Sequence, residues 1–550
     1  MKKRLKLLLF VIPVSLLVAF SPTKDRYFDI VKNLDIFATL FKEVNAYYVD
    51  EVNINKIMRT GIEAMLASLD PYTNYIPEDD IEDYLTVTTG EYGGIGALVN
   101  RKNGVSTIVL PYKGYPADRA GLVIGDEVHK INGTEIKDKS SEEINKLLKG
   151  QSNSAITLTI KRYGQEEMFD VDLSREKITI NNVPYSGMVT SDIGYIRLTD
   201  FTTKAGAEVA SALKTLKTEG ATKVILDLRG NPGGLLEEAV NVSNVFIPKG
   251  QEVVSTRGKL DAWTKSYKSL NSPVDTNIPL AVLIDNGSAS ASEIVAGVVQ
   301  DYDRGVLVGR RTFGKGLVQQ TRPLPYNSQL KVTTAKYYIP SGRCIQAIDY
   351  SNRNLDGSVG KIPDSLKVEF STYNGRIVYD GGGLDPDISV SKNQWAPITY
   401  TLLNKDHVFN FATKYVFDHP EGIGSAKEFR LSNAEYDEFV SFLKEKDYEY
   451  TTRVERTIEA VEKAAKEEKY YEEIKSQIKE LQKATLHNKE QDLRKFKPEI
   501  TALLEQEIAS RYFLEEGIIQ STFDKDRDIL EAVKALNSDK KYQELLSTNQ

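Results

Sequence analysis

Residues 278–301 read IPLAVLIDNGSASASEIVAGVVQD, and they set the architecture of the middle of the chain. The unbroken apolar run IPLAVLI is typical of a buried strand, and the apolar spacing after the serines is typical of a helix. Ser290 and Glu293 fit a capping box at the helix start, which is a structural interpretation. A serine on such a corner can also be a nucleophile, because its hydroxyl stands beside unpaired helix N–H groups.

The alternation of strands and helices extends through residues 176–390. Strand-like IGYIRL precedes a helical segment near KAGAEVASALKTLKTEG, and strand-like KVILDLRGNPGG precedes the helical LLEEAVNVSNVF. Such alternation predicts an α/β architecture for this segment.

The composition limits the class of protein. A chain of 550 residues is too long for one core, so several domains are expected. A net charge of -7 and a pI near 5.6 argue against a nucleic-acid partner, because nucleic-acid binders usually carry a basic face. The single cysteine, Cys344, excludes an internal disulfide framework and a multi-cysteine zinc site. We predict neither a metal nor another cofactor.

The first residues of the chain indicate export from the cytoplasm. MKKRLK is basic, and LLLFVIPVSLLVAF is an apolar stretch like the core of a secretory signal. The cleavage motif around Phe20 is poor, so two interpretations of residues 1–22 stay open: a signal peptide and an N-terminal anchor in the inner membrane. Both predict a periplasmic or cell-envelope location.

Three further regions flank the α/β segment. Residues 25–90 have helix-period apolar positions and predict a helical N-terminal region. Residues 91–175 change to short strands and glycine turns, which predicts a small, mostly β module. Residues 395–550 are rich in charge and helix formers, and they predict a helical C-terminal region.

The β module contains a candidate peptide-binding groove. The glycines of YGGIGALVN let successive backbone N–H groups converge on an anion, and the following strand offers an edge to an extended peptide. A free carboxylate is the expected guest, and the helix of SSEEINKLLKG offers a pocket for the last apolar side chain. The predicted groove residues are Gly93, Gly94, Ile95, Gly96, Ile144, Leu147 and Leu148. With ADRAGLVIGDEVHKINGTEI behind it, the module strongly resembles a PDZ domain.

The positions of the histidines limit which side chain can act as a base for Ser290. His129, His407, His419 and His487 all lie outside the α/β segment, so a serine nucleophile there needs another base. Lys315, in RTFGKGLVQQ, is the substitute, and Gln319 lies on the same face if the chain is extended. A lysine has a pKa of about 10.4, and lowering it to about 7 by burial costs roughly 4 kcal/mol. An exposed turn with a solvated lysine is the structural alternative.

The turn of VILDLRGNPGGLLEEAV offers a site for an oxyanion. A buried strand ends at Pro-Gly-Gly before a helix, which can leave backbone N–H groups free to donate. The N–H groups of Gly233 and Ala291 are the predicted pair, although a plain strand-to-helix turn explains the same letters.

These motifs together resemble the carboxyl-terminal processing proteases, also called tail-specific proteases. The resemblance covers about residues 35–390, and the motifs occur in the family's order: LDPYTNY, YGGIG, AGLVIGDEVHKINGTEI, DLRGNPGG, GSASASEIVAG and RTFGKGLVQ. It implies a crotonase/ClpP-like α/β protease core with an inserted PDZ domain. It also implies Ser290 as nucleophile, Lys315 as base, Gln319 as the residue that orients the lysine, and backbone oxyanion donors at Gly233 and Ala291.

The implied enzyme is a serine endopeptidase that recognises free apolar C-terminal tails and cleaves through an acyl-enzyme. Two other classes stay open: an exported PDZ scaffold that binds peptides without cutting them, and a structural envelope protein organised by the helical tail. The expected partners are proteins or peptides with free tails, and assembly into a homo-oligomer is left open.

Overall fold

The computed structural model describes residues 23–354, 358–485 and 489–547, so the predicted signal or anchor at 1–22 lies outside the described residues. The chain divides into two compact units, residues 1–75 with 330–332, and residues 76–329 with 333–550. The smaller unit contains helices α2 (Thr23–Tyr47) and α3 (Ile54–Ala67). All further description concerns the larger unit unless stated.

A six-stranded sheet forms the centre of the α/β core. The strand order is β10-β11-β12-β15-β16-β23, in which β10 is antiparallel to β11 and the remaining neighbours are parallel. IPLAVLI supplies the central strand β15, whose residues are all buried, as the apolar run predicts. The strands are β10 (Tyr185–Met188), β11 (Ile193–Arg197), β12 (Lys223–Asp227), β15 (Leu280–Ile284), β16 (Val306–Gly309) and β23 (Ile388–Ser389).

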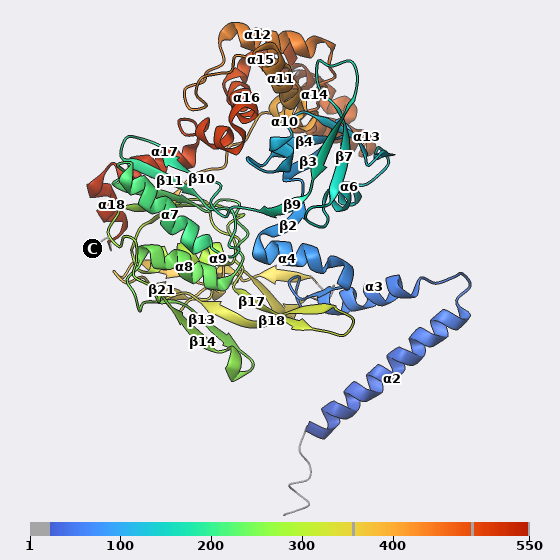
Figure 1. The fold of residues 1–550 in the computed structure, drawn as a ribbon, viewed down its shortest axis with the longest axis vertical. Helices are drawn as coiled ribbons and strands as arrows, with labels where there is room; N and C mark the ends of the chain where they lie inside the picture. Colours follow the sequence, from blue (N-terminus) through green and yellow to red (C-terminus); the bar gives the residue numbers. More distant parts are fainter. Residues whose placement is uncertain (1–22, 355–357, 486–488, 548–550) are drawn as a thin grey trace, which may run out of the picture. The chain divides into compact units, whose positions relative to one another are not determined.

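The two faces of this sheet are covered by helices from distant parts of the chain (Figure 1). Val282 and Ile284 point into a core shared with α7 (Ala205–Thr218), α8 (Leu236–Phe246) and α9 (Ala291–Asp301). Ala281 and Leu283 point to the opposite face, which is covered by α17 (Arg527–Leu536) and α18 (Asp539–Leu545). The last helices of the chain therefore complete the core, because side chains alternate along each strand.

A second sheet packs on the side of α8 and α9. It has five strands in the order β1-β18-β13-β14, with β17 also paired to β18, and β1 spans Asn74–Ile76. Val253, Val254 and Tyr337 join the same core as the helices. The strands are β13 (Glu252–Gly258), β14 (Lys265–Lys268), β17 (Leu317–Pro323) and β18 (Gln329–Tyr338). Two short ladders follow, β19 (Ile348–Arg353) with β20 (Val359–Lys361), and β21 (Glu369–Ser371) with β22 (Ile377–Tyr379).

The β module has its own sheet and core. Its strand order is β3-β4-β5-β7-β8, with β6 beside β5, and the helices α5 and α6 cover it. A two-stranded ladder of β2 with β9 leads into and out of the module. The elements are α4 (Ile81–Thr89), β2 (Glu91–Gly94), β3 (Ala97–Lys102), β4 (Val105–Pro111), α5 (Pro116–Arg119), β5 (Glu127–Ile131), β6 (Thr134–Glu135), α6 (Ser141–Leu148), β7 (Ala155–Lys161), β8 (Phe169–Ser174) and β9 (Glu176–Thr179).

The helical C-terminal region touches the β module as well as the core. Asp406 accepts hydrogen bonds from Lys102 Nζ at 2.8 Å and from the Asn103 N–H at 3.0 Å. The ring of Phe417 packs edge-on against Tyr163, with centroids 5.5 Å apart. The helices are α10 (Pro397–Asn404), α11 (His407–Asp418), α12 (Asn433–Phe442), α13 (Arg453–Glu467), α14 (Tyr471–Thr485), α15 (Lys489–Lys495) and α16 (Lys497–Gln520). In the described part of the chain, none of the helices has the length and apolarity that crossing a bilayer requires.

Candidate active site

The three alternating serines have different environments. The Ser288 hydroxyl donates to Leu228 O at 2.8 Å, and the Ser292 hydroxyl donates to Asn231 O at 2.9 Å, so both tie the turn to the neighbouring loop. Both side chains are fully buried, whereas Ser290 is partly exposed at the start of α9. Ser290 also has φ 55° and ψ -113°, a strained backbone conformation that non-glycine residues rarely adopt. Among the three serines, only Ser290 has a positive φ.

The Glu293 carboxylate joins the serine turn to the lysine loop. Its Oε2 accepts from the N–H of Ser290 and from the N–H of Lys315, each at 2.9 Å. Its Oε1 accepts from Thr312 Oγ1 at 2.6 Å and from the Gly314 N–H at 2.7 Å. Complete burial raises the pKa of Glu293 to about 7, although these four donors favour the ionised form.

Tyr337 makes a second connection between the same two loops. Its hydroxyl lies 2.6 Å from Lys315 O and 3.2 Å from Ser290 O. Tyr337 sits on β18 and is 1% exposed, so the second sheet fixes the position of the hydroxyl. The structure therefore brings Ser290 and Lys315 together through their backbones. The sequence pattern predicts only a capping role for Glu293, and it contains no signal that marks Tyr337.

Gln319 lies on β17, and its amide nitrogen donates to Thr333 Oγ1 at 3.1 Å. The sequence predicts that Lys315 and Gln319 share a face if the chain is extended from Lys315 onward, but β17 begins only at Leu317. Lys315 belongs to the loop before the strand, where Glu293 and the Gly316–Gln346 hydrogen bond of 2.7 Å fix the backbone.

The Pro-Gly-Gly turn lies against the serine turn. A Cβ on Gly233 would fall 2.8 Å from Ala291 N and 2.8 Å from Ser290 Cβ, so glycine is required for this approach. The N–H of Gly233 donates to Asn231 Oδ1 at 2.9 Å. The N–H groups of Gly234 and Ala291 have no acceptor among the residues that the structure describes. The predicted Gly233 donor is thus engaged within its own loop in this conformation.

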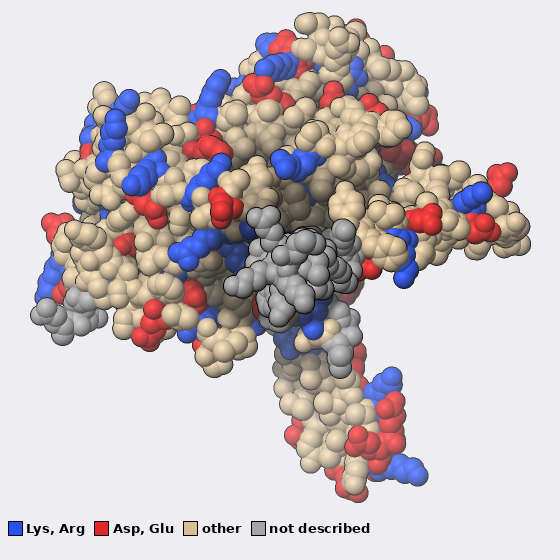
Figure 2. All heavy atoms as spheres, turned by 90° about the horizontal axis from the view of Figure 1, so that it is seen from below, with Lys and Arg blue, Asp and Glu red and all other residues tan. Residues whose placement is uncertain are grey.

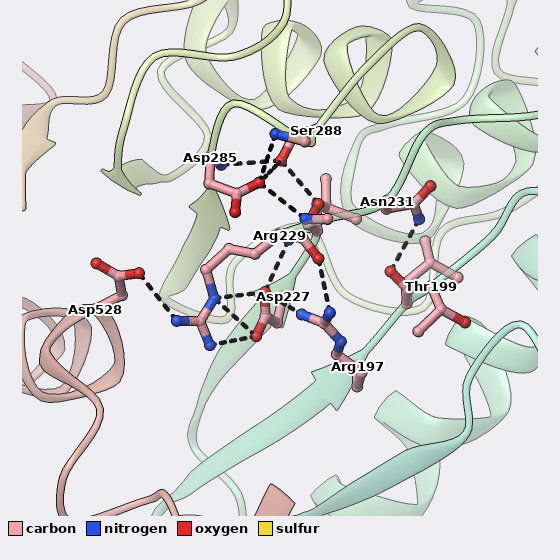
Figure 3. A network of polar contacts seen from close by, with 12 residues as sticks. Arg197, Thr199, Asp227, Arg229, Asn231, Asp285, Ser288 and Asp528 are labelled. Atoms are coloured by element: carbon pink, nitrogen blue, oxygen red, sulfur yellow. Dashed lines mark hydrogen bonds and ion pairs between the residues drawn. The ribbon is translucent and has the colours of Figure 1, made fainter. Parts of the chain in front are cut away.

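A buried ion network of Asp227, Arg197 and Arg229 lies at the start of the loop that contains the Pro-Gly-Gly turn (Figure 3). Asp227, at the end of β12, forms ion pairs with Arg197 at 2.8 Å and Arg229 at 2.6 Å. Burial raises the pKa of Asp227, but the two arginines outweigh this effect and hold the pKa well below its usual range. Arg229 also contacts Asp526 at 2.7 Å and Asp528 at 2.9 Å, so α17 is tied to the loop.

The same network reaches the serine turn. Asp285 Oδ1 accepts from the N–H of Gly230 at 2.8 Å and from the N–H of Gly287 at 2.9 Å. The Ser288 hydroxyl accepts from the Asp285 N–H at 3.0 Å, as Figure 3 shows. The two turns beside Ser290 are therefore held by one set of polar contacts.

The residues predicted to form the peptide groove lie on β2, on the two positions between β2 and β3, and on α6. Ile144 and Leu148 belong to the core of the β module, whereas Leu147 is 37% exposed, so the three side chains do not share one face. Gly93 and Gly94 are paired with β9. The N–H groups of Ile95 and Gly96 have no acceptor within the described ranges. None of the described residues form a group of three or more His, Cys, Asp or Glu that could hold a metal ion.

Three family models match the chain. Residues 192–351 match peptidase family S41, residues 107–162 match the PDZ domain, and residues 398–536 match the "Probable PDZ-protease, C-terminal helical domain". The matches coincide with the α/β core, the β module and the helical C-terminal region.

Curated relatives carry names of the same kind. The carboxy-terminal-processing protease of Bartonella bacilliformis is 38% identical over 337 residues, which are 60% of this chain and 77% of the relative. A "Probable CtpA-like serine protease" of Staphylococcus aureus is 37% identical over 316 residues, 57% of this chain and 62% of the relative. A solved photosystem II D1 C-terminal processing protease is 26% identical, with a TM-score of 0.36 over 64% of this chain and 92% of that one.

The α/β core, the PDZ domain and these matches define a PDZ-containing serine-type peptidase, which is a hydrolase. The chain belongs to the carboxy-terminal-processing proteases of peptidase family S41. The predicted family and the predicted multidomain α/β fold with a PDZ domain and a helical C-terminal region are confirmed.

Proposed function

We propose that this protease cleaves peptide bonds with Ser290 as nucleophile and Lys315 as general base. One observation carries the proposal: Glu293 Oε2 accepts from the backbone N–H of both residues, so the two are held against each other. Neutral Lys315 removes the hydroxyl proton while Ser290 Oγ attacks the carbonyl carbon. Lys315 then passes that proton to the leaving amine as the C–N bond breaks. Water, deprotonated by Lys315, hydrolyses the acyl-enzyme and releases Ser290.

We place the oxyanion of the tetrahedral intermediate beside Ala291. The N–H group of Ala291 comes directly after the nucleophile in the chain and has no acceptor among the described residues. Gly233 is the proposed second donor, and its N–H becomes available when the hydrogen bond to Asn231 Oδ1 opens. We keep Gln319 as the residue that orients Lys315, because it lies two positions into the strand that follows the lysine loop.

Variants of the two reacting residues test this assignment. Ser290→Ala and Lys315→Ala are each expected to abolish turnover and to retain the fold, because nucleophile and base act as a unit. Lys315→Arg is also expected to be inactive, since a guanidinium does not lose its proton in proteins. Ser288→Ala is the matched control and retains measurable turnover, because its hydroxyl only ties loops together. Wild-type cleavage by Ser290→Ala would disprove the assignment.

The PDZ domain is proposed to select free apolar C-terminal tails. The available N–H groups of Ile95 and Gly96 precede β3, and β3 is an edge strand to which an extended peptide can add. A terminal carboxylate fits these donors, and its charged hydrogen bonds are roughly twice as strong as neutral ones. Gly93 and Gly94 belong to the strand β2 directly before these donors. On α6, the exposed Leu147 is the residue proposed to contact the last side chain, while Ile144 and Leu148 support it from the core of the module.

Amidation of the substrate tests tail selection without changing the scissile bond. A peptide with a free apolar tail and its amidated twin are compared at concentrations well below saturation. The free tail should give the higher kcat/KM, and blocking the PDZ groove should remove the difference. Equal cleavage of both peptides by the unblocked enzyme would contradict selection by the PDZ domain.

An envelope location and self-association complete the proposed function. Export rests on the sequence of residues 1–22, so fractionation of cells is its test. A homo-oligomer is supported by α2, whose apolar residues repeat at coiled-coil spacing and include the exposed Tyr27, Ile30, Leu34 and Phe37. Light scattering of the exported chain measures the oligomer, and charged residues at Leu34 and Phe37 should dissociate it.

Each predicted segment has its own proposed role. Residues 25–90 form the N-terminal helices, and residues 91–175 select the tail of the substrate. Residues 176–390 cleave the substrate, and residues 395–550 support both the PDZ domain and the protease core. The crotonase/ClpP-like form of the core stays a prediction.

A further inference from the structure

A groove of about 1270 Å³ lies between the α/β core and the helical C-terminal region. Its floor contains Arg229 and Arg310, and its walls are the linker from Ser391 to Trp395, the first turns of α16 and the start of α17. The lining includes neither Ser290 nor Lys315 and no residue of the PDZ domain. The groove is therefore distinct from both sites of the proposed function.

Basic residues outnumber acidic ones in the lining by eight to four, although the whole chain carries a net charge of -7. On the face drawn in Figure 2, by contrast, acidic and basic side chains are interspersed. The basic residues of the lining are Arg229, Arg310, Lys392, Arg494, Lys495, Lys497, Lys525 and Arg527, and the acidic residues are Glu499, Glu505, Asp526 and Asp528.

The four acidic residues are all engaged inside the protein. Asp526 and Asp528 bind Arg229, and Asp528 also binds Arg310 at 3.0 Å. Glu505 pairs with Lys525, and Glu499 accepts from the Ala396 N–H at 2.9 Å. Three of the four acidic residues are therefore paired with cations of the protein, and the Glu499 carboxylate is hydrogen-bonded to the neutral Ala396 N–H.

Four cations of the lining form no ion pair within residues 23–354, 358–485 and 489–547. They are Lys497, which lies over the Tyr436 ring, and the exposed Lys392, Lys495 and Arg527. Trp395 and Tyr400 line the same groove, and their ring centroids are 5.6 Å apart. Uncompensated positive charge beside an aromatic surface favours a ligand that alternates carboxylates with flat or apolar groups.

We propose that this groove is a second binding site of the enzyme, for an extended acidic peptide segment. The volume exceeds that of ordinary small-molecule pockets, which hold roughly 300–1,000 Å³, and suits a stretch of chain. A nucleic acid is a poorer fit, because a phosphate backbone needs a long basic surface and only four lining cations lack an ion pair among the described residues. The site does not depend on the assignment of Ser290 and Lys315.

The tryptophan in the groove provides the assay. The chain has two tryptophans, so Trp263→Phe leaves Trp395 as the sole fluorescent reporter. An acetylated and amidated Glu-rich peptide is the probe, because blocked ends cannot enter the PDZ groove as a free tail. A Gln-rich peptide of equal length is the neutral control, and calorimetry on the same samples detects binding that leaves the fluorescence unchanged.

We expect saturable binding of the Glu-rich peptide that weakens as salt is added. Replacing Lys392, Lys495 and Arg527 together by alanine should weaken binding about tenfold, the combined effect of three exposed ion pairs. Alanine at the exposed Lys463, Lys479 and Lys540 is the matched control and should leave binding unchanged. Absence of binding, equal binding of the Gln-rich peptide or of polyphosphate, or full affinity in the first triple variant would each overturn the proposal.

Discussion

Glu293→Gln is the substitution that most directly tests how the active site is held. The side chain keeps its size, but one carboxylate oxygen becomes an NH2 group. In the wild-type protein each oxygen accepts two hydrogen bonds, from Ser290 and Lys315 on one side and from Thr312 and Gly314 on the other. Either orientation of the amide therefore places a donor against two donors in a site without solvent.

The size of the effect follows from these contacts. Each buried donor left without an acceptor costs about 1–3 kcal/mol, so two such donors cost about 2–6 kcal/mol. Thr312 can rotate its hydroxyl, so the amide is expected to turn its nitrogen toward Thr312 and Gly314 and to strain the lysine loop. If about half of this cost, about 1–3 kcal/mol, falls on the transition state, kcat decreases about 5–150-fold, because a tenfold change corresponds to about 1.4 kcal/mol.

Steady-state cleavage of a tailed peptide, measured from below to above pH 7, provides the assay. In the wild-type enzyme kcat/KM should decrease steeply as the pH is lowered below 7. Two groups must be deprotonated in the active form: Glu293, with a pKa of about 7, and Lys315. In Glu293→Gln only the lysine remains, so the decline should become shallower. Glu237→Gln, an exposed glutamate on α8, is the matched control. A Glu293→Gln enzyme with normal kcat and the same steep decline would refute the positioning role.

Three further changes test neighbouring parts of the site. Gly233→Ala should lower kcat at least tenfold while circular dichroism stays native, because φ is +97° and the new Cβ would lie 2.7 Å from Ala289 O. Asp528→Asn should lower the free energy of unfolding in urea by roughly 3 kcal/mol and reduce kcat, because Arg229 and Arg310 lose a buried partner. Folding raises the pKa of Glu293 from 4.5 to about 7, so between these pH values the folded wild-type protein binds one more proton than the unfolded chain. The free energy of unfolding of the wild-type protein, relative to that of Glu293→Gln, should therefore decrease by roughly 3 kcal/mol as the pH rises from 4.5 to 7. A flat difference in urea titrations across this range would contradict the raised pKa.

Features set by short stretches of chain could be predicted from the sequence. IPLAVLI became the buried strand β15, and the serines led into α9, because strand and helix periodicities are local signals. The histidine count also needs no structure, since it leaves the α/β segment without the usual base. The loop around Lys315 was predicted less well. The strand expected from Lys315 onward begins only at Leu317, because the N–H groups of Lys315 and Gly316 donate to the side chains of Glu293 and Gln346.

Contacts between distant segments could not be predicted in this way. Tyr337 is an ordinary strand residue by pattern, and its hydroxyl matters only because β18 packs beside α9. Asp528 lies in a capped helix far from the motifs, and nothing local shows that it meets Arg229. The same holds for α17 and α18, which belong by sequence to the helical C-terminal region but cover one face of the core sheet.

This arrangement has a consequence for how the protease is controlled. The C-terminal region contacts the PDZ domain through Asp406 and the catalytic core through Asp526 and Asp528. Arg229, which receives the second contact, lies in the loop that carries the proposed oxyanion donor Gly233. A shift of the helical region that weakened the Asp528–Arg229 pair would therefore loosen this loop more than it moves Ser290, because Glu293 and Tyr337 hold the serine turn in addition to the contacts that it shares with the loop. Signals from the helical region are thus expected to act on oxyanion stabilisation, and so on kcat, before they act on the nucleophile.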